Sequence, residues 1–253
     1  MVCVENLTFA YDAQPVLRNV SLTLQKGAIT TLIGANGCGK TTLLKLMTKN
    51  LKPDSGRIRL EGTDLRSMSL KDLARRAAIV HQKNTAPDDL TVRRLVSYGR
   101  LPYTSPLRSQ TGKDREKIEW ALSVTDMSEL GEKPMGTLSG GQRQRAFLSM
   151  ALAQDTKLLY LDEPTTFLDV RYQIELLRLI RRLNRELGLT VVMVLHDINQ
   201  ALCHSDEVIG LKDGTVYCQG APEKVIDADA VRELYGIDLE IRRENNRLWV
   251  MTV

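Results

Sequence analysis

The clearest chemical pattern is a glycine-rich segment, GANGCGKTT, that runs from Gly34 to Thr42. It satisfies GxxxxGK[ST], and it stands between an apolar, strand-like segment and one with helical spacing of leucines. Glycines let backbone N–H groups turn toward phosphate oxygens, and a helix starting at Lys40 directs its positive end at them. Lys40 supplies charge for the outer phosphates, and the Thr41 hydroxyl suits Mg²⁺. We predict a nucleotide phosphate site, since the flanking elements disfavour a chance glycine turn.

Two adjacent carboxylates, Asp162 and Glu163, follow each other in the apolar run LLYLDEP. Such a run is typical of a buried parallel strand, and ligands gather at the carboxyl ends of parallel strands. Asp162 can hold Mg²⁺ through water, while Glu163 can orient and deprotonate an attacking water molecule. An acidic turn at a strand end is the alternative, and the phosphate loop upstream favours the chemical interpretation.

A second anion site is indicated by LSGGQRQR, in which Ser139 and two glycines lead into a helical stretch. A helix that begins in this way presents its N-terminal N–H groups to an anion. The segment cannot easily serve phosphates that Gly39 and Lys40 of the same chain already hold. A second phosphate cradle therefore suggests a partner copy whose nucleotide it completes, with a chance glycine turn as the alternative.

The elements that must position these residues alternate between strands and helices. From about residue 83 to residue 137 strand signals vanish, and Thr91, Ser109 and Thr111 introduce helical spacing. Gly188 ends a helix, Asp213-Gly214 turns a hairpin, and Asn245-Asn246 turns another. Strands are predicted at 2–9, 20–24, 29–33, 56–60, 158–161, 190–195, 207–211 and 215–219, and a late helix at 228–235. The alternation predicts an α/β fold, with a mostly parallel sheet, helices on its faces and a helical insert.

Length and composition are those of one large globular domain. The chain has 253 residues, of which 43% are hydrophobic and 26% charged, and its formal net charge is +4. Basic residues are scattered rather than gathered in a stripe, which argues against a nucleic-acid partner. No apolar run reaches the roughly 18 residues of a membrane-spanning helix, and the first residues predict no secretory signal. Cysteines without CxxC spacing are typical of reduced thiols in a cytosolic protein.

The order of these motifs resembles that of ABC ATPase domains. Over essentially the whole chain the motifs follow one another in the order GANGCGKTT, Gln82, LSGGQ, LLYLDEP, and His196 after VVMVL. The resemblance implies an α/β fold with a P-loop NTPase (RecA-like) core, a small antiparallel β subdomain and an inserted helical subdomain at about 83–137. It implies a single ABC ATPase domain over 1–253, in which a C-terminal helix and hairpin occupy about 228–253.

The resemblance also implies roles for individual residues. Tyr11 resembles the aromatic residue that stacks on adenine, and Gln82 the glutamine that touches Mg²⁺ or the attacking water. Asp162 resembles the Mg²⁺-associated aspartate, Glu163 the catalytic base, and His196 the histidine that contacts the γ-phosphate. The phosphate loop of the family matches Gly34, Ala35, Asn36, Gly37, Cys38, Gly39, Lys40, Thr41 and Thr42.

The remaining matches concern an opposite subunit and the metal. Ser139, Gly140, Gly141 and Gln142 resemble the signature that meets the γ-phosphate bound by that subunit, and Thr166, Phe167, Leu168 and Asp169 the loop that crosses the dimer seam. Mg²⁺ is expected at Thr41, Gln82 and Asp162. Ala35 stands where the family often has proline and Thr41 where it often has serine, and neither departure threatens the chemistry.

A finer resemblance is to the ATPases of bacterial iron-chelate importers, including those for ferric siderophores, with haem and cobalamin importers as near relatives. This resemblance is carried by GRLPYTSP, MALAQDT, DEPTTFLD and MVLHDINQA. It implies an ATPase that uses Mg²⁺ and works as a homodimer, peripherally bound at the cytoplasmic face of the inner membrane. Its partners would be separate transmembrane permease subunits and, indirectly, a substrate-binding protein. An exporter ATPase, a soluble ABC ATPase without a transport role, and a regulatory module without turnover are the alternatives; Glu163 and the intact signature disfavour the last.

Two further groups could carry chemistry. Cys38, inside the phosphate loop, is either a small tolerated residue or an exposed thiol made reactive by the helix N-terminus. His196, Cys203 and His204 could be imagined as metal ligands, but the helix expected between them lacks the close spacing of a metal site.

Overall fold

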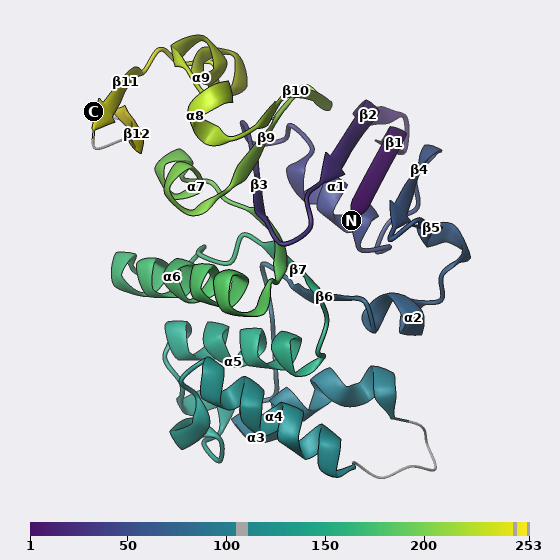
Figure 1. Cartoon of the computed structure of the whole chain (residues 1–253), viewed down its shortest axis with the longest axis vertical. Helices are drawn as coiled ribbons and strands as arrows, with labels where there is room; N and C mark the ends of the chain where they lie inside the picture. Colours follow the sequence, from purple (N-terminus) through teal and green to yellow (C-terminus); the bar gives the residue numbers. More distant parts are fainter. Residues whose placement is uncertain (105–110, 245–246, 252–253) are drawn as a thin grey trace. The chain divides into compact units, whose positions relative to one another are not determined.

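The computed structural model describes residues 1–104, 111–244 and 247–251 (Figure 1). It divides the chain into two compact units, of which unit 1 comprises Met1–Ser69 with Asn184–Val253 and unit 2 comprises Leu70–Leu183. The expected turn at Asn245-Asn246 and the expected helix start at Ser109 lie outside the described residues.

Unit 1 begins with a small antiparallel sheet. Its strand order is β2-β1-β4-β5, formed by β1 (Val2–Tyr11), β2 (Gln14–Leu24), β4 (Ser55–Leu60) and β5 (Thr63–Asp64). Val2 pairs with Leu24 and Val4 pairs with Leu22, and all four side chains are buried. The alternation of buried and partly exposed residues along β1 is the period expected of a strand with one face on the core.

The phosphate loop of unit 1 follows a strand of a second, mostly parallel set. The order is β10-β9-β3-β8, formed by β3 (Ile29–Ile33), β8 (Thr190–Val194), β9 (Glu207–Lys212) and β10 (Thr215–Gly220). β3 runs parallel to both β8 and β9, and every residue of β3 and β8 is buried. Asp213 and Gly214 turn the β9–β10 hairpin with φ of 47° and 78°, as their sequence predicts.

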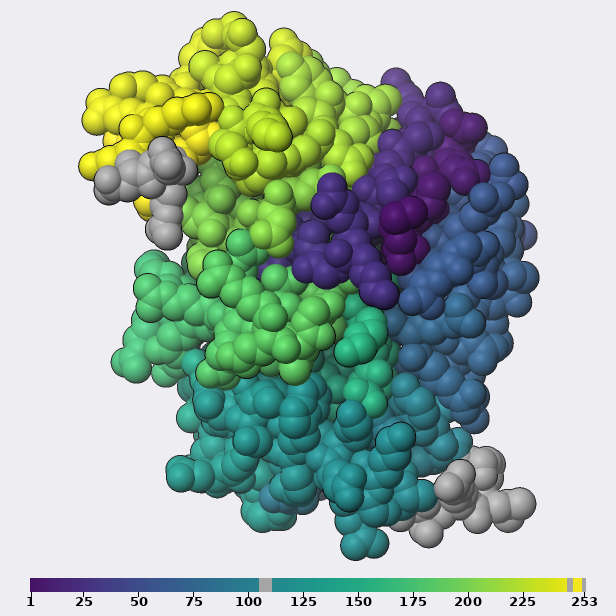
Figure 2. All heavy atoms as spheres, viewed as in Figure 1, coloured from purple at the N-terminus to yellow at the C-terminus, as the bar shows by residue number. Residues whose placement is uncertain are grey.

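Helices follow these strands. α1 (Lys40–Met47) comes after β3, α7 (Ile198–His204) after β8, and α8 (Pro222–Val225) and α9 (Ala228–Tyr235) after β10; η1 (Leu65–Ser67) is a short 3₁₀ turn. The hairpin of β11 (Glu240–Glu244) and β12 (Arg247–Met251) comes last. α8 contacts both β10 and β12, and α9 contacts β9. In Figure 2 the yellow C-terminal residues lie directly against the yellow-green residues that precede them.

Unit 2 joins two strands to a group of helices. β6 (Ala77–Val80) and β7 (Leu158–Asp162) are parallel neighbours. The helices are α2 (Leu70–Ala74), α3 (Val92–Ser97), α4 (Gly112–Val124), α5 (Gly140–Ala153) and most of α6 (Val170–Leu187), with 3₁₀ turns η2 (Tyr98–Tyr103), η3 (Ser128–Leu130) and η4 (Met135–Thr137). α3, α4 and α5 pack on one another. Thr91 and Thr111 cap α3 and α4, as predicted.

One difference from the predicted strands has a tertiary cause. β2 begins at Gln14 instead of residue 20, because its first residues pair with Phe9, Ala10 and Tyr11 of β1. Pro15 weakens the local strand signal, yet proline is tolerated on an edge strand, and β2 is the outer strand of this sheet. The proposal that residues 83–137 form a subdomain of their own stays a prediction.

A buried ion pair ties α4 to η2 within unit 2. Arg100 and Asp114 are 3% and 6% exposed, and Arg100 Nε lies 2.9 Å from Asp114 Oδ1. Arg100 also donates to the Ala153 carbonyl, and Asp114 Oδ2 accepts from the N–H and hydroxyl of Thr111. Burial raises the pKa of Asp114, but the hydrogen bonds from Thr111 and Arg100 outweigh it and lower that pKa from 3.8 to about 2.

Asp114→Asn should therefore lower the free energy of unfolding by about 3 kcal/mol at neutral pH, because it leaves the Arg100 guanidinium buried without its charged partner. The folded-state pKa is depressed, so the carboxylate's stabilisation is complete above about pH 4 and is lost as pH falls toward about 2. The difference between wild type and variant should shrink across that window, as measured by urea unfolding.

The matched control is Asp155→Asn, which removes an exposed ion pair with Lys117 and should change the free energy of unfolding by less than about 1 kcal/mol. Equal losses in the two variants, or a loss in Asp114→Asn that is independent of pH, would contradict the assignment.

Candidate functional site

The phosphate loop in unit 1 connects β3 to α1 and is folded around the Lys40 ammonium. Lys40 Nζ donates to the carbonyls of Gly34 and Ala35, at 2.8 and 2.9 Å. The side chain is only 5% exposed, so its charge lies within the loop. Gly39 stands at the N-cap of α1, whose first N–H groups are directed toward the loop. A cation surrounded by main chain at a helix N-terminus is the arrangement predicted for a phosphate cradle.

Glycine is required at two positions of the loop, because the backbone there has a positive φ and because neighbouring atoms leave no room for a Cβ. Gly34 has φ of 133°, and a Cβ there would lie 2.3 Å from the Leu211 carbonyl oxygen. Gly39 has φ of 107°, and its Cβ would lie 2.6 Å from Leu17 Cδ2. The loop can therefore pack against β2 and β9 only if both residues lack side chains.

Cys38 is not the exposed thiol that one hypothesis required. Its side chain is 7% exposed, and Sγ accepts a long contact from Lys40 Nζ at 3.7 Å. Because the thiol packs inside the loop, the hypothesis of an exposed, unusually reactive cysteine is wrong. Cys38 fills space beside Gly34, where an added Cβ would lie 3.0 Å from the sulfur.

Tyr11 and His196 are the other predicted nucleotide contacts in unit 1. Tyr11, at the end of β1, is 43% exposed, and its ring meets Phe9 edge to face with centroids 4.9 Å apart. His196 is exposed in the segment between β8 and α7, and the next residue, Asp197, caps α7. Among the described residues, no group of three or more His, Cys, Asp or Glu could hold a metal, which disfavours a site at His196, Cys203 and His204.

The acidic site in unit 2 lies at the carboxyl ends of β6 and β7. Asp162 ends β7, and Glu163 follows it with φ of 50°, a left-handed conformation that is unusual for glutamate. Gln82, which follows β6, donates its Nε2 to Glu163 Oε2, and Thr166 Oγ1 donates to the same oxygen at 3.2 Å. The two parallel strands thus bring Gln82 and Glu163 together, as ligand sites at strand ends require.

The signature segment begins α5 with a capping box. Ser139 Oγ accepts from the Gln142 N–H at 3.3 Å, and Gln142 Oε1 accepts from the Ser139 N–H at 3.0 Å. Tyr172, near the start of α6, covers Gly141, where a Cβ would lie 2.6 Å from the ring. Sequence patterns did not single out Tyr172, because its partner is thirty-one positions earlier in the chain.

Comparison with known proteins decides the family. The model of the ABC transporter family matches residues 17–166. The chain belongs to the ABC transporter family. The predicted resemblance and fold class are thereby confirmed.

Relatives within this family match over most of the chain. The Iron(3+)-hydroxamate import ATP-binding protein FhuC of Bacillus subtilis is 46% identical, with 94% of this chain and 88% of that protein covered. The ferric enterobactin transport ATP-binding protein FepC of Escherichia coli is 40% identical, with 92% and 86% covered. The ATP-binding cassette MJ0796, solved as a dimer in a post-hydrolysis state with ADP and Pi, superposes with a TM-score of 0.74 at 27% identity, covering 87% of this chain and 98% of that one.

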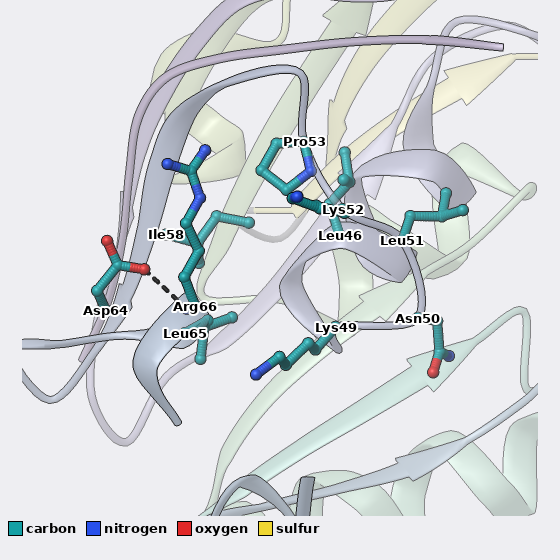
Figure 3. Close-up of a pocket in the computed structure, with 10 residues that line it drawn as sticks. All are labelled: Leu46, Lys49, Asn50, Leu51, Lys52, Pro53, Ile58, Asp64, Leu65 and Arg66. Carbon is teal, nitrogen blue, oxygen red and sulfur yellow. Dashed lines mark hydrogen bonds between the residues drawn. The ribbon is translucent and has the colours of Figure 1, made fainter. Parts of the chain in front are cut away.

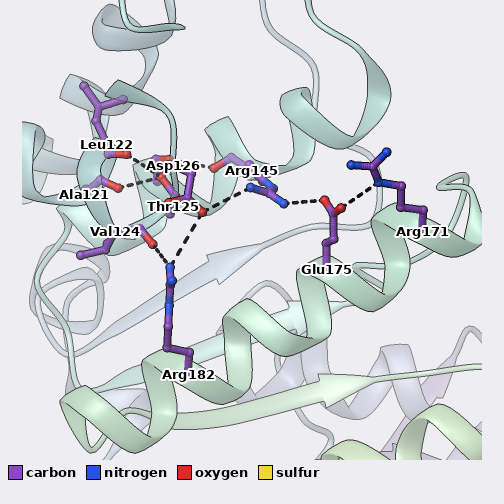
Figure 4. Close-up of polar contacts among 10 residues, drawn as sticks. Ala121, Leu122, Val124, Thr125, Asp126, Arg145, Arg171, Glu175 and Arg182 are labelled. Atoms are coloured by element: carbon purple, nitrogen blue, oxygen red, sulfur yellow. Dashed lines mark hydrogen bonds and ion pairs between the residues drawn. The ribbon is translucent and has the colours of Figure 1, made fainter. Parts of the chain in front are cut away.

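A chain of charged contacts anchors the signature helix of this ABC protein (Figure 4). Glu175 of α6 accepts from Arg171 at 2.9 Å and from Arg145 of α5 at 2.8 Å. The hydrogen bond from Arg171 is the largest influence that holds the pKa of Glu175 below its usual value. Arg145 also lies 3.5 Å from Asp126, and Arg182 donates to the Val124 carbonyl at 2.7 Å. These contacts join α5 and α6 to the end of α4.

The segment before α6 exposes large apolar side chains. Phe167 has φ of 67° and is 81% exposed, and Val170, the first residue of α6, is 70% exposed. Apolar groups presented together to solvent are typical of an interaction surface. Thr166 connects this segment to Glu163, because its hydroxyl donates to the carboxylate and its N–H donates to the Glu163 carbonyl, each at 3.2 Å.

A cavity in unit 1 lies away from the phosphate loop (Figure 3). It has a volume of about 330 Å³ and is lined by Leu46, Lys49, Asn50, Leu51, Lys52, Pro53, Ile58, Asp64, Leu65 and Arg66. These residues begin at the carboxyl end of α1, whereas the loop joins its amino end. The helix carbonyls at this end disfavour anions, whereas Lys49, Lys52 and Arg66 in the lining favour them, so the cavity lacks the helix N-terminus that the phosphate loop has. Within the described ranges, no helix is both long and apolar enough to cross a membrane.

Gly141→Ala should lower the free energy of unfolding by about 1–3 kcal/mol, because its methyl group overlaps the Tyr172 ring. The measurement is urea unfolding of the full chain. Adding Tyr172→Ala should recover part of the loss, which a double-mutant cycle quantifies.

Gly140→Ala is the matched control. The nearest atom to its Cβ is Leu168 Cδ2 at 3.8 Å, an ordinary contact, so the change in free energy of unfolding should stay below about 1 kcal/mol. The Tyr172 contact is refuted if both alanine variants behave alike.

Proposed function

We propose that this chain is the ATP-hydrolysing subunit of an importer that moves an iron chelate, of the ferric siderophore class, through a separate membrane permease. Family membership supports the ATPase activity, and relatives such as FhuC, named for Iron(3+)-hydroxamate import, support the cargo class. The phosphate loop, with Lys40 enclosed by its own main chain, supports nucleotide binding.

The nucleotide is assigned to the loop residues Gly34 to Thr42, with the Tyr11 ring stacking on adenine. The exposure of the Tyr11 ring, which is 43% accessible, supports that assignment. Lys40, which the carbonyls of Gly34 and Ala35 hold within the loop, is assigned to the outer phosphates. His196, exposed before α7, is assigned to the γ-phosphate.

Mg²⁺ is assigned to Thr41, Gln82 and Asp162. Their hydroxyl, amide and carboxylate oxygens are the hard donors that Mg²⁺ takes in nucleotide sites, so the donor set fits the ion. When bound, the ion would neutralise charge on the β- and γ-phosphates.

Glu163 is assigned as the catalytic base, and its setting is the observation that carries the proposed ATPase chemistry. Two donors, Gln82 and Thr166, meet one carboxylate oxygen, which fixes the plane of the group. A fixed carboxylate can take a proton from water as that water attacks the γ-phosphorus, releasing ADP and phosphate. Gln82 acts here by orienting Glu163.

A second copy of the chain completes the assignment. The signature residues Ser139, Gly140, Gly141 and Gln142 begin α5 with N–H groups suited to an anion, and we assign them to the γ-phosphate held by the partner copy. The exposed Phe167 and Val170 support a dimer seam at this segment. The dimeric state reported for MJ0796 supports the same arrangement.

The remaining partners follow from the import assignment. The permease subunits would span the membrane, the dimer would bind them at the cytoplasmic face, and a substrate-binding protein would act indirectly through them. The import-system names of the relatives support these partners.

Glu163→Gln should reduce kcat for ATP hydrolysis by about 100-fold or more, because glutamine cannot accept the proton of the attacking water. The Kd for ATP should stay within a few-fold of wild type, and the variant should form an ATP-dependent dimer in size-exclusion chromatography with light scattering. Glu186→Gln, an exposed change on α6, is the control and should behave as wild type. Normal turnover by Glu163→Gln would remove the base assignment.

The import proposal is tested by pull-down of the tagged chain from native membranes, followed by ATPase assays on the recovered complex. We expect a multi-spanning partner and a higher ATPase rate when a binding protein loaded with a ferric siderophore is added. Recovery of soluble partners alone would reject the transport role, while stimulation by an exported compound would reject import.

A further inference from the structure

The C-terminal helix α9 contacts the start of the phosphate loop through two hydrogen bonds within unit 1. The Ala35 N–H donates to the Leu234 carbonyl at 3.0 Å. The Gly34 N–H donates to the Tyr235 hydroxyl at 3.3 Å. Tyr235 is the last residue of α9, and its hydroxyl accepts from the loop where the Lys40 side chain donates to it.

One of these bonds acts on a peptide unit that holds Lys40, and the other acts on the peptide unit just before it. The peptide between Gly34 and Ala35 donates its N–H to Leu234, and its carbonyl accepts from Lys40 Nζ at 2.8 Å. The preceding peptide donates its N–H to Tyr235. Because a peptide unit is planar, fixing the direction of its N–H also fixes the direction of its carbonyl. α9 therefore sets the orientation of a carbonyl that holds the lysine.

α9 is itself well fixed. Asp227 caps its N-terminus by accepting from the Ala230 N–H at 2.8 Å, and Gly236 ends it with φ of 73°. Leu234 is 2% exposed and packs on Gly210 of β9, where a Cβ would lie 2.9 Å from the leucine side chain. Burial raises the pKa of Tyr235 to about 12, so the hydroxyl that accepts from the Gly34 N–H is uncharged at physiological pH.

The hairpin that follows α9 is tied to the helix after His196. Asn199 Nδ2 donates to the Val250 carbonyl at 2.9 Å, and the Val250 N–H donates to Asn199 Oδ1 at 2.8 Å. Asn199 lies on α7, which starts two residues after His196. The C-terminal segment thus contacts the start of the phosphate loop and the helix that follows His196.

We propose that Tyr235 is a positioning residue for ATP binding, which holds the peptide unit between Ile33 and Gly34, at the entry to the phosphate loop, in the conformation that accepts phosphate. The inference rests on the proposed ATPase function and extends it to a residue outside the motifs. A preformed loop loses less conformational freedom when the nucleotide binds. Tyr235 should therefore affect the affinity for ATP and leave the chemical step, assigned to Glu163, unchanged.

Tyr235→Phe tests this in the full chain. It removes the hydroxyl and keeps the ring. We expect Kd for ATP and ADP, by calorimetry, and KM for ATP to rise about 3- to 10-fold, in line with the loss of one neutral hydrogen bond. The value of kcat should stay within about 2-fold of wild type. A purely structural role would lower the unfolding temperature and leave Kd and KM as they are.

Tyr103→Phe is the matched control. It removes another half-buried tyrosine hydroxyl, which donates to the Gln154 carbonyl at 2.9 Å in unit 2, and it should leave Kd, KM and kcat unchanged. If both tyrosine variants raise KM equally, the specific role of Tyr235 is overturned.

Gly210→Ala provides a second route if Tyr235→Phe does not fold. The added methyl would lie 2.7 Å from Cys218 Sγ and 2.9 and 3.0 Å from the Leu234 side chain, so it strains the packing of α9 on β9 while keeping the tyrosine. A rise in KM at constant kcat supports the proposal, and an unchanged KM overturns it. If the wild-type protein binds and hydrolyses ATP and both variants have normal Kd and KM for ATP, this inference is rejected and the proposed function stands. Wild-type protein that does not bind ATP rejects the proposed function, and the inference with it.

Discussion

The peptide unit between Gly34 and Ala35 is held from both sides, and the phosphate loop depends on it. Its carbonyl binds the Lys40 ammonium and its N–H binds the Leu234 carbonyl, while Gly34 can sit against Leu211 only because it has no side chain. A charge that is 5% exposed needs such partners, since an unpaired buried ammonium is costly. The main chain supplies them here, so the lysine is pre-positioned by backbone geometry instead of by a carboxylate that would compete with phosphate.

In unit 2, side chains instead of main-chain groups orient the charged residue of the site. Glu163 has a left-handed backbone and a carboxylate oxygen shared by Gln82 and Thr166, so its direction is determined by neighbours on two strand ends. The signature glycines are covered by residues at and just before the start of α6: Tyr172 lies against Gly141 and Leu168 against Gly140. Arg145 and Glu175 then link α5 to α6. The loop before α6 and the signature are thereby held by one set of contacts within a single unit.

Features governed by local rules could be predicted from the sequence. The glycine-rich loop, the caps at Thr91 and Thr111, and the Asp213-Gly214 turn depend on neighbouring residues, and the structure has them as predicted. Features governed by distant contacts could not. The early start of β2 requires pairing with β1, the burial of Cys38 requires the packing of Gly34 and Lys40, and the contacts of Tyr172 and Tyr235 join residues far apart in the chain. Motifs therefore located the chemical groups, while the residues that orient them became visible only in three dimensions.

The Asn199 amide has a consequence for how the chain behaves among its own copies. β12 belongs to a two-stranded sheet, and such a strand normally leaves an edge whose N–H and C=O groups can template another strand. Asn199 occupies both backbone groups of Val250, much as the main chain of a neighbouring strand would. A single side chain thus occupies the position on this edge at which a strand from another copy of the chain would pair with Val250.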